Sequence, residues 1–222
     1  MKSLAIFGST GSIGESALKV YSQNNKKFNL VFLSAHTNFK KLIKQQKKYK
    51  PKKIILTGNN KNFNNKITDK EFLFYNYKKK IDYTISGVSG YDAIDLNFKL
   101  LKISKNLLIA NKETIICGGK FFLDSAKKNN CKIIPIDSEH HCLNFLFNEC
   151  KIKQENIKKI YVTASGGPFL KKKIKYNESV ASVINHPNWK MGKKISVNSS
   201  NFSNKVLELF EAKILFNIHP KK

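Results

Sequence analysis

The chain has 222 residues, of which 41% are hydrophobic and 16 are phenylalanine, which is enough apolar material for the core of one large or two small domains. Its formal net charge is +26, but all 41 basic residues are lysine and they are scattered along the chain, so we expect no nucleic-acid partner. A run of eighteen apolar residues and a signal peptide are both missing from the sequence, so we expect a cytoplasmic protein without a membrane partner.

Six short apolar segments with strand character alternate with segments that can form helices. The expected strands are residues 4–7, 30–33, 53–56, 83–86, 107–110 and 132–136. This alternation predicts an α/β fold with a Rossmann-like, doubly wound parallel sheet.

The pattern changes after the last of these strands. A helix-like segment runs to about residue 150, a strand is expected at 160–163, and a long loop rich in glycine and proline precedes a helix at about 201–216. We place a domain boundary near residue 137, so that 1–137 form the nucleotide-binding domain and 138–222 form a second, catalytic α/β domain.

A glycine-spaced turn follows the first expected strand and leads into a helix. Its residues are Gly8, Ser9, Thr10, Gly11, Ser12, Ile13 and Gly14. Glycines at this spacing allow a tight turn, a close approach of backbone amides to a pyrophosphate, and close packing of the helix on the strand. The free amides of the helix N-terminus then face the anion. We predict a dinucleotide-binding turn; the alternative is a purely structural turn.

The end of the second expected strand bears on which dinucleotide is bound. An NAD enzyme usually carries an acidic residue there for the ribose hydroxyl. This chain has His36, Thr37 and Asn38 instead, with Lys40 and Lys41 close behind. The pattern favours the 2′-phosphate of NADPH, although both lysines would also suit a solvated helix face.

Two groups of polar residues suggest a divalent metal. Asp137 and Glu139 follow a strand two residues apart, so in an extended segment both carboxylates would point the same way. Asn204, Lys205 and Glu208 have spacings of three and four residues, which predicts one shared helix face. Oxygen ligands favour Mg²⁺ or Mn²⁺ over zinc. The alternative for Lys205 and Glu208 is an ordinary surface ion pair.

Two further segments suggest a phosphate site with a movable cover. Residues 165–169 place the Ser165 hydroxyl in a glycine turn at a strand end, which suits a phosphate, and Ser199, Asn204 and Lys205 add donors. Residues 186–192 hold the only tryptophan and could close over a ligand. The alternative is that this tryptophan anchors the loop to the core.

The cysteines and the adjacent histidines offer weaker signals. No zinc-ligand spacing occurs among the four cysteines, which we expect to be buried small hydrophobic residues: Cys117, Cys131, Cys142 and Cys150. Neighbouring side chains point apart, so we expect structural roles for His140 and His141.

Six segments in the same order closely resemble the 1-deoxy-D-xylulose 5-phosphate reductoisomerase family. They are residues 8–14 (GSTGSIG), 110–113 (ANKE), 137–140 (DSEH), 165–169 (SGGPF), 186–196 (HPNWKMGKKIS) and 204–208 (NKVLE). The resemblance implies conversion of 1-deoxy-D-xylulose 5-phosphate into 2-C-methyl-D-erythritol 4-phosphate in isoprenoid biosynthesis, with NADPH as hydride donor and Mg²⁺ or Mn²⁺ as the metal. It also implies a homodimer at full length.

The same resemblance assigns roles to residues. Metal ligands would be Asp137, Glu139 and Glu208, which with Lys112 form the catalytic set. The phosphate of the sugar would be bound by Ser165, Ser199, Asn204 and Lys205. Ser138 would contact the rest of the substrate, with His186 and Trp189 in the closing loop. Besides the glycine turn, the cofactor would contact His36, Asn38, Ala110, Asn111, Lys112, Glu113, Met191 and Gly192.

The chain departs from the family pattern in three places. His36-Thr37-Asn38 stands where the family often has Gly-Lys-Asn, which weakens the expected preference for NADPH, and Asn198-Ser199-Ser200 replaces the common Asp-Ser-Ala. Family members are nearly twice as long. We therefore expect residues 138–222 to be marginally stable, with apolar surface exposed on the last helix.

Two other readings remain open at this stage. The first is a truncated, non-catalytic NADPH-binding remnant of the same enzyme. The second is a different Gly-x-Thr-Gly-x-x-Gly oxidoreductase with Cys142 or Cys150 as nucleophile.

Overall fold

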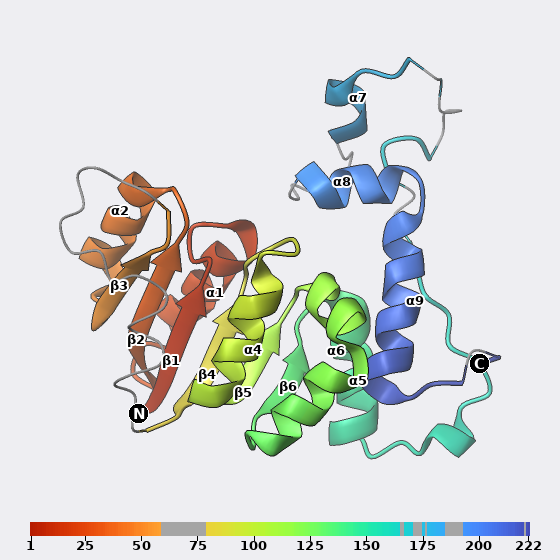
Figure 1. The fold of residues 1–222 in the computed structure, drawn as a ribbon, viewed down its shortest axis with the longest axis horizontal. Helices are drawn as coiled ribbons and strands as arrows, with labels where there is room; N and C mark the ends of the chain where they lie inside the picture. Colours follow the sequence, from red (N-terminus) through yellow and green to blue (C-terminus); the bar gives the residue numbers. More distant parts are fainter. Residues whose placement is uncertain (59–78, 165–166, 171–174, 176, 185–192, 220) are drawn as a thin grey trace. The chain divides into compact units, whose positions relative to one another are not determined.

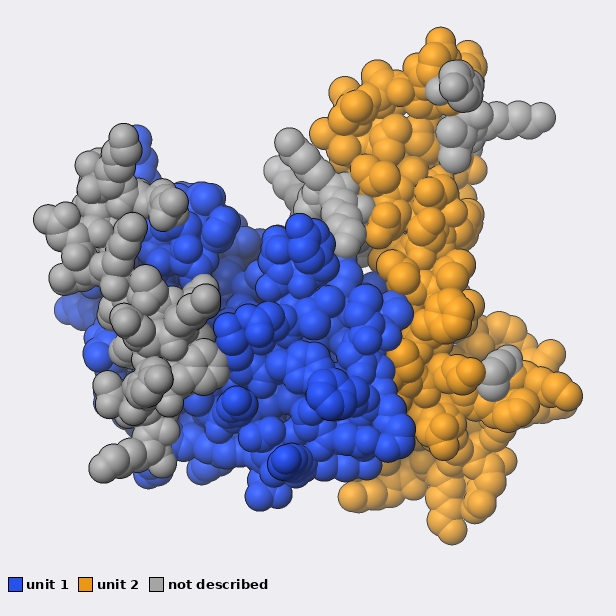
Figure 2. Space-filling model, in the orientation of Figure 1, with its two compact units in different colours: residues 1–137 blue, residues 138–222 orange. Residues whose placement is uncertain are grey.

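The computed structural model describes the chain except for residues 59–78, 165–166, 171–174, 176, 185–192 and 220 (Figure 1). It divides into two compact units, Met1–Asp137 (unit 1) and Ser138–Lys222 (unit 2), which are coloured separately in Figure 2. Each unit is described by itself below.

Unit 1 is built on a six-stranded sheet with the order β3-β2-β1-β4-β5-β6. The strands are β1 Lys2–Phe7, β2 Phe28–Ala35, β3 Lys53–Leu56, β4 Ile81–Ser86, β5 Ser104–Ile109 and β6 Lys132–Pro135. Every neighbouring pair is parallel. The α/β, Rossmann-like fold expected from the sequence is confirmed, and each of the six expected strands is present.

The helices of unit 1 connect these strands. They are α1 Ser12–Gln23, α2 Phe39–Tyr49, α4 Ala93–Ile103 and α5 Lys112–Lys128. Crossovers between parallel strands are right-handed, and the chain moves in opposite directions from β1 and from β4, so α1 and α2 cover one face and α4 and α5 the other (Figure 1). No helix in the described part of the chain is long and apolar enough to cross a membrane.

The two halves of the sheet meet at β1 and β4, where the strand order reverses. Phe7 pairs with Ser86 at the carboxyl ends of these strands, and the Gly87 amide donates to the Phe7 carbonyl over 2.8 Å. In open α/β sheets a ligand binds in the crevice outside this reversal point. The fold therefore predicts a ligand site at the loops on the carboxyl edge of β1, β2, β4 and β5.

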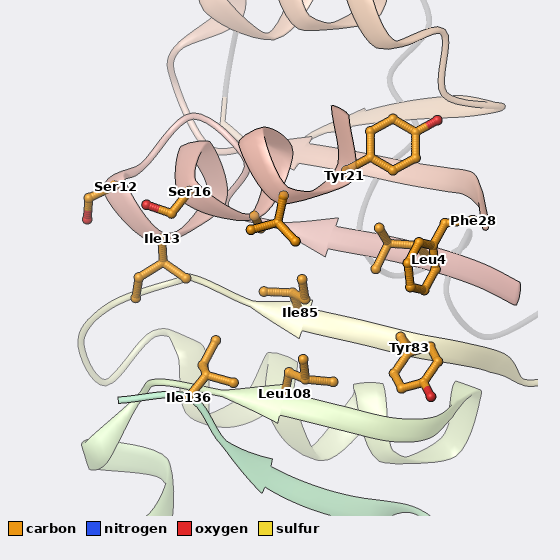
Figure 3. Close-up of a pocket in the computed structure, with 12 residues that line it drawn as sticks. Leu4, Ser12, Ile13, Ser16, Tyr21, Phe28, Tyr83, Ile85, Leu108 and Ile136 are labelled. Atoms are coloured by element: carbon orange, nitrogen blue, oxygen red, sulfur yellow. The ribbon is translucent and has the colours of Figure 1, made fainter. Parts of the chain in front are cut away.

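An apolar pocket of about 710 Å³ lies along α1 and over β1, β4 and β5 (Figure 3). In Figure 3, Ile13, Ile85, Leu108 and Ile136 face the same space. None of the side chains that line it is charged. Apart from the hydroxyls of Ser12, Ser16, Tyr21 and Tyr83, the lining is apolar, and the pocket lies on the apolar face of the sheet.

Unit 2 is helical in its described part. Its elements are α6 Ser138–Asn144, a π-helical turn Phe145–Glu149, a 3-10 turn Gln154–Asn156, α7 Val180–Ile184, α8 Lys193–Ser200 and α9 Ser203–Phe216. The strand expected at 160–163 is wrong, because these residues find no partner strand among the described residues; the Ile160 amide instead donates to the Lys222 carbonyl.

The last expected helix, at about 201–216, is confirmed as α9, and α8 precedes it in the segment expected as a loop. The chain turns between α8 and α9 at Phe202, whose φ of 62° lies in the left-handed region that a helix cannot contain. The turn allows α9 to begin at Ser203, so Asn204, Lys205 and Glu208 all lie in its first two turns.

The core formed by the described residues of unit 2 is small. Leu143, Ala212 and Ile218 are its buried hydrophobic residues, joined by a ring contact between Phe147 and Phe216 with centroids 5.4 Å apart. On α9, three hydrophobic side chains remain more than half exposed: Val206 (51%), Leu209 (56%) and Phe210 (53%). The apolar surface expected on the last helix is confirmed.

Candidate active site

The glycine turn between β1 and α1 has a steric reason for two of its glycines. Gly8 has a φ of 75°, and a Cβ there would lie 2.9 Å from the carbonyl carbon of Gly87. A Cβ on Gly14 would lie only 2.4 Å from the Gly8 carbonyl oxygen. Gly11 is different, because its Cβ would meet that oxygen at an ordinary 3.4 Å. The turn and the first turn of α1 therefore pack closely only because these positions lack side chains.

Buried hydrogen bonds hold this turn against β2 and α2. The Ser9 hydroxyl donates to the Gln45 side-chain oxygen over 2.7 Å, and the Gln45 amide donates back to the Ser9 carbonyl over 2.8 Å. The Ser9 backbone amide donates to the Ser34 carbonyl over 2.8 Å. Sequence reasoning missed Gln45; its signal was a polar residue one turn after the buried Leu42, on the inward face of α2.

The segment after β2 also contacts the glycine turn. The Lys41 ammonium donates to the Thr10 carbonyl over 2.9 Å and pairs with the Glu15 carboxylate over 2.7 Å. The Asn38 side chain caps α2 by accepting from the Lys41 amide over 3.2 Å. His36 Nδ1 lies 2.8 Å from the Thr57 hydroxyl at the end of β3. The residues expected to bind the adenosine ribose thus lie beside the turn expected to bind the pyrophosphate.

The Ala110-Asn111-Lys112-Glu113 segment joins β5 to α5. The Asn111 side chain accepts from the Thr114 amide over 2.7 Å and so caps α5, whose first residue is Lys112. Its amide group donates to the Gly90 carbonyl and to the Glu113 carboxylate, each over 3.0 Å. Asn111 thereby fixes both the start of α5 and the loop after β4, at the carboxyl edge where the glycine turn also lies.

Two carboxylates of unit 2 converge on one cation. The Lys205 ammonium lies 2.7 Å from a Glu139 oxygen, and it also contacts the Glu208 carboxylate. Glu208 accepts a further hydrogen bond from the Asn204 amide, so the helix face expected for these residues is observed. Glu139, however, lies in the first turn of α6 and not in the extended segment that we expected, because Ser138 already begins the helix.

Burial distinguishes this cluster from a surface ion pair. The Glu208 side chain is 3% exposed and that of Lys205 is 19% exposed, so the surface-pair alternative is wrong. Burial by itself raises the pKa of Glu139, but hydrogen bonds from Lys205 and Ser138 outweigh it and hold the pKa below its ordinary value. Burial likewise lowers the pKa of Lys205, and its bonds to Glu139 and Glu208 outweigh that effect and raise it. Glu139 and Lys205 therefore keep their opposite charges at neutral pH.

A buried histidine, His140, connects α6 to α9 next to this cluster. The side chains of His140 and Glu211 are both 1% exposed, with His140 Nδ1 3.5 Å from a Glu211 oxygen. His140 Nε2 lies 2.9 Å from the Glu208 carbonyl, and because a carbonyl can only accept, Nε2 carries the proton. Glu211 was missed by sequence reasoning; its signal was its position three residues after Glu208 on the same helix. Asp137, the last residue of unit 1, directly precedes α6.

The expected phosphate-binding residues are only partly described. A Cβ on Gly167 would lie 2.4 Å from the Ser199 carbonyl oxygen, and Gly167 has a φ of 63°. The loop after residue 166 therefore lies directly against α8, and α8 leads through the Phe202 turn to Asn204 and Lys205. Five expected site residues lie outside the described residues: Ser165, His186, Trp189, Met191 and Gly192.

A second pocket, in unit 2, has a volume of about 490 Å³, and Ser138, Glu139 and Glu208 are among the residues that line it. Cys142 also lines this pocket and is exposed. The expectation that the cysteines are buried is wrong for Cys117, Cys142 and Cys150, because each lies on an outward helical surface or at its end. Cys131 is buried, and burial raises the pKa of its thiol to about 11, which leaves it unreactive.

Comparison with known proteins gives one family for both units. The profile of 1-deoxy-D-xylulose 5-phosphate reductoisomerase matches residues 4–119, and that of the C-terminal domain of the same enzyme matches residues 133–216. The reductoisomerase of Pelagibacter ubique is 41% identical over 100% of this chain and 60% of its own length. That of the Wolbachia strain from Drosophila simulans is 36% identical over 100% of this chain and 59% of its own.

Comparison with solved structures gives the same family. A crystal structure of DOX-P reductoisomerase in complex with NADPH, fosmidomycin and magnesium superposes with a TM-score of 0.82 at 30% identity, covering 99% of this chain and 59% of that one. The reductoisomerase of Zymomonas mobilis in complex with NADPH gives 0.76 at 25% identity, covering 100% and 60%. The chain spans about 60% of the length of the curated relatives that it matches. It belongs to the 1-deoxy-D-xylulose 5-phosphate reductoisomerase family.

Proposed function

We propose that this protein takes part in the NADPH- and metal-dependent conversion of 1-deoxy-D-xylulose 5-phosphate into 2-C-methyl-D-erythritol 4-phosphate. The observation that supports this most is the cluster of Glu139, Lys205 and Glu208, in which two largely buried carboxylates share one cation. That cluster combines the two requirements of the reaction, a cation site and a charged donor for a sugar phosphate.

Unit 1 fits a dinucleotide. Its glycine turn packs closely because Gly8 and Gly14 lack side chains, and it lies at the N-terminus of α1, where free amides favour a pyrophosphate. NADPH, when bound, supplies the hydride. Gly8 to Gly14 would hold its pyrophosphate, His36 and Asn38 its ribose, and Ala110 to Glu113 the nicotinamide side, together with Met191 and Gly192.

Unit 2 fits a hard divalent cation. The carboxylates of Glu139 and Glu208 already converge on the ammonium of Lys205, a cation that stands where two anionic ligands meet. We propose that Glu139 and Glu208, with Asp137, hold Mg²⁺ or Mn²⁺. The metal, when bound, supplies a Lewis acid for the oxygen atoms of the substrate.

The remaining residues would bind and orient the sugar phosphate. Lys205 and Asn204 offer a charge and an amide at the start of α9, and Ser199 lies on the helix before it. These three, with Ser165, would hold the phosphate, and Ser138 would contact the carbon chain. Phosphate binding orders the reacting end of the substrate, where Lys112 would lie between the cofactor and the sugar. His186 and Trp189 would close over the substrate and exclude water.

A non-catalytic, NADPH-binding remnant of that enzyme is the second candidate. The observation that favours it is that α9 leaves Val206, Leu209 and Phe210 exposed. For the first candidate we expect a cytoplasmic homodimer.

Oxidation of NADPH in the presence of the pentulose phosphate and Mg²⁺ or Mn²⁺ tests the proposal. We expect metal-dependent oxidation by the wild-type chain and none by Glu208→Gln. NADPH binding without oxidation, in a folded chain, would instead establish the remnant. Activity that survives Glu208→Gln or metal removal would overturn the proposed site.

A further inference from the structure

The Lys41 ammonium occupies the space between the two loops that a dinucleotide contacts. It extends from the first turn of α2 to the Thr10 carbonyl, 2.9 Å away, in the glycine turn. It is also paired with the Glu15 carboxylate of α1 over 2.7 Å. The Lys41 side chain is 34% exposed, so it is held in place but remains partly accessible to a ligand.

The fold indicates which part of the dinucleotide lies there. β1 and β2 are parallel neighbours, with Ile6 paired to Leu33, so the loops after them open at the same edge. In such sheets the pyrophosphate lies on the first glycine turn, and the ribose of the adenosine lies at the end of the second strand. A cation that bridges these two loops therefore lies next to that ribose and its 2′ position.

The segment after β2 lacks another fixed charge. His36, Thr37 and Asn38 include no acidic group that would prefer the ribose hydroxyl of NAD, and Thr37 is neutral where family members often have lysine. Lys40 is exposed to solvent one residue away. Lys41 differs from Lys40 because two contacts fix its ammonium beside the glycine turn.

We propose that Lys41 determines the preference of this chain for a 2′-phosphate, and that Glu15 limits this preference by sharing the ammonium. The inference rests on the proposed NADPH-binding function and adds a residue outside the usual Gly-Lys-Asn segment. An ionised hydrogen bond to a phosphate is stronger than one to a hydroxyl, so Lys41 distinguishes the two cofactors. Glu15 acts in the opposite sense because its carboxylate competes with the phosphate for the same ammonium.

Dissociation constants measured by titration calorimetry test this inference. The ligands are NADPH, NADH and the fragment pair adenosine 2′,5′-bisphosphate and 5′-AMP, which probe the ribose site alone. Lys41→Met should weaken binding of NADPH and of the bisphosphate about tenfold and leave NADH and 5′-AMP unchanged. Lys41→Arg should restore most of the loss. Lys40→Met, the matched control, removes the same charge one residue away and should change binding less than about twofold.

The substitution Glu15→Gln provides an independent test of the inference. It should tighten NADPH about threefold in the wild-type background and have no effect when Lys41 is methionine. If Lys41→Met weakens the binding of all four ligands equally, Lys41 only supports the Thr10 turn. If Lys40→Met weakens NADPH binding as much as Lys41→Met does, the effect comes from the general positive charge of the surface. Either result overturns the inference. A wild-type chain that binds neither dinucleotide overturns the proposed function as well, whereas NADPH binding insensitive to Lys41 overturns only this inference.

Discussion

Unit 1 and unit 2 differ in how completely their own residues bury their hydrophobic side chains. In unit 1, six paired strands bury large side chains such as Phe7, Phe32 and Phe122 with almost no exposed area. In the described part of unit 2, three buried hydrophobic residues form the core, and α9 leaves an apolar face exposed. Unit 1 therefore has an extensive core of its own, whereas the described part of unit 2 depends more on the polar contacts between α6 and α9.

The largest expected effect is in unit 1. Gly14→Ala places a Cβ 2.4 Å from the Gly8 carbonyl oxygen, where neither backbone can move without opening the turn. We expect a loss of about 3 kcal/mol in the free energy of unfolding, together with loss of NADPH binding. Gly11→Ala, with an ordinary contact at 3.4 Å, should leave the free energy of unfolding unchanged and weaken only NADPH binding. Urea unfolding of the Gly14→Ala and Gly11→Ala variants measures both stabilities. Equal values would show that the turn is not tightly packed.

In unit 2 the largest effect should come from Glu208→Gln. The substitution keeps the shape of the side chain but removes one of the two charges that converge on a cation. We expect the affinity for Mn²⁺, measured by electron paramagnetic resonance, to fall about a hundredfold. Glu155→Gln removes a 72% exposed carboxylate from the same unit and should leave the affinity unchanged. Equal metal binding by both variants would contradict the proposed ligand.

His140→Ala tests whether the buried contacts of α6 with α9 hold unit 2 together. Removal of the imidazole leaves the Glu208 carbonyl and the Glu211 carboxylate without this buried partner, so we expect a loss of about 2 kcal/mol in the stability of unit 2. The exposed neighbour His141→Ala serves as control and should change stability by less than about 0.5 kcal/mol. Hydrogen exchange of α9 amides would report the difference; similar exchange in both variants would show that His140 is dispensable.

The contrast between the units also explains what the sequence could predict. Strands of a parallel sheet with helices on both faces are rich in apolar residues, so all six were evident in the sequence, with most ends misplaced by one to three residues. The glycine turn was equally evident, because its glycines recur every third residue directly after an apolar run. The strand expected at 160–163 failed since an apolar run specifies a strand only if a partner strand exists, and partners are not local.

Polar partners were the hardest to predict. Gln45 and Glu211 look like solvated helix residues until the fold places Ser9 and His140 against them. The extended arrangement expected for Asp137 and Glu139 failed for a related reason: a period of two applies only within a strand, and Ser138 had already started a helix. Spacing within one helix was more reliable, as the shared face of Asn204, Lys205 and Glu208 illustrates.

The smallest expected effect is a pH dependence confined to unit 1. Asp82 joins three strands, because its carboxylate accepts from the Lys105 ammonium of β5 over 2.7 Å and from the Ser3 amide of β1 over 2.9 Å. The bond from Lys105, followed by those from Ser3, holds the pKa of Asp82 well below its ordinary value of 3.8. A carboxyl group with a lowered pKa in the folded state stabilises above its ordinary pKa and loses that contribution as pH falls through the folded value.

Asp82→Asn should therefore reduce the free energy of unfolding by about 1 kcal/mol at neutral pH, a figure kept small because the Lys105 side chain is half exposed. The difference from the wild type should shrink below about pH 4, where the carboxyl group of the unfolded chain begins to protonate, and should vanish as pH falls through the lowered pKa of the folded state. Asp95→Asn removes a 76% exposed carboxylate of a pair within α4 and should show no such pH dependence. Urea titrations across this range measure both variants, and a constant difference for Asp82→Asn would mean that its bonds to β1 and β5 stabilise the sheet by geometry and not by charge.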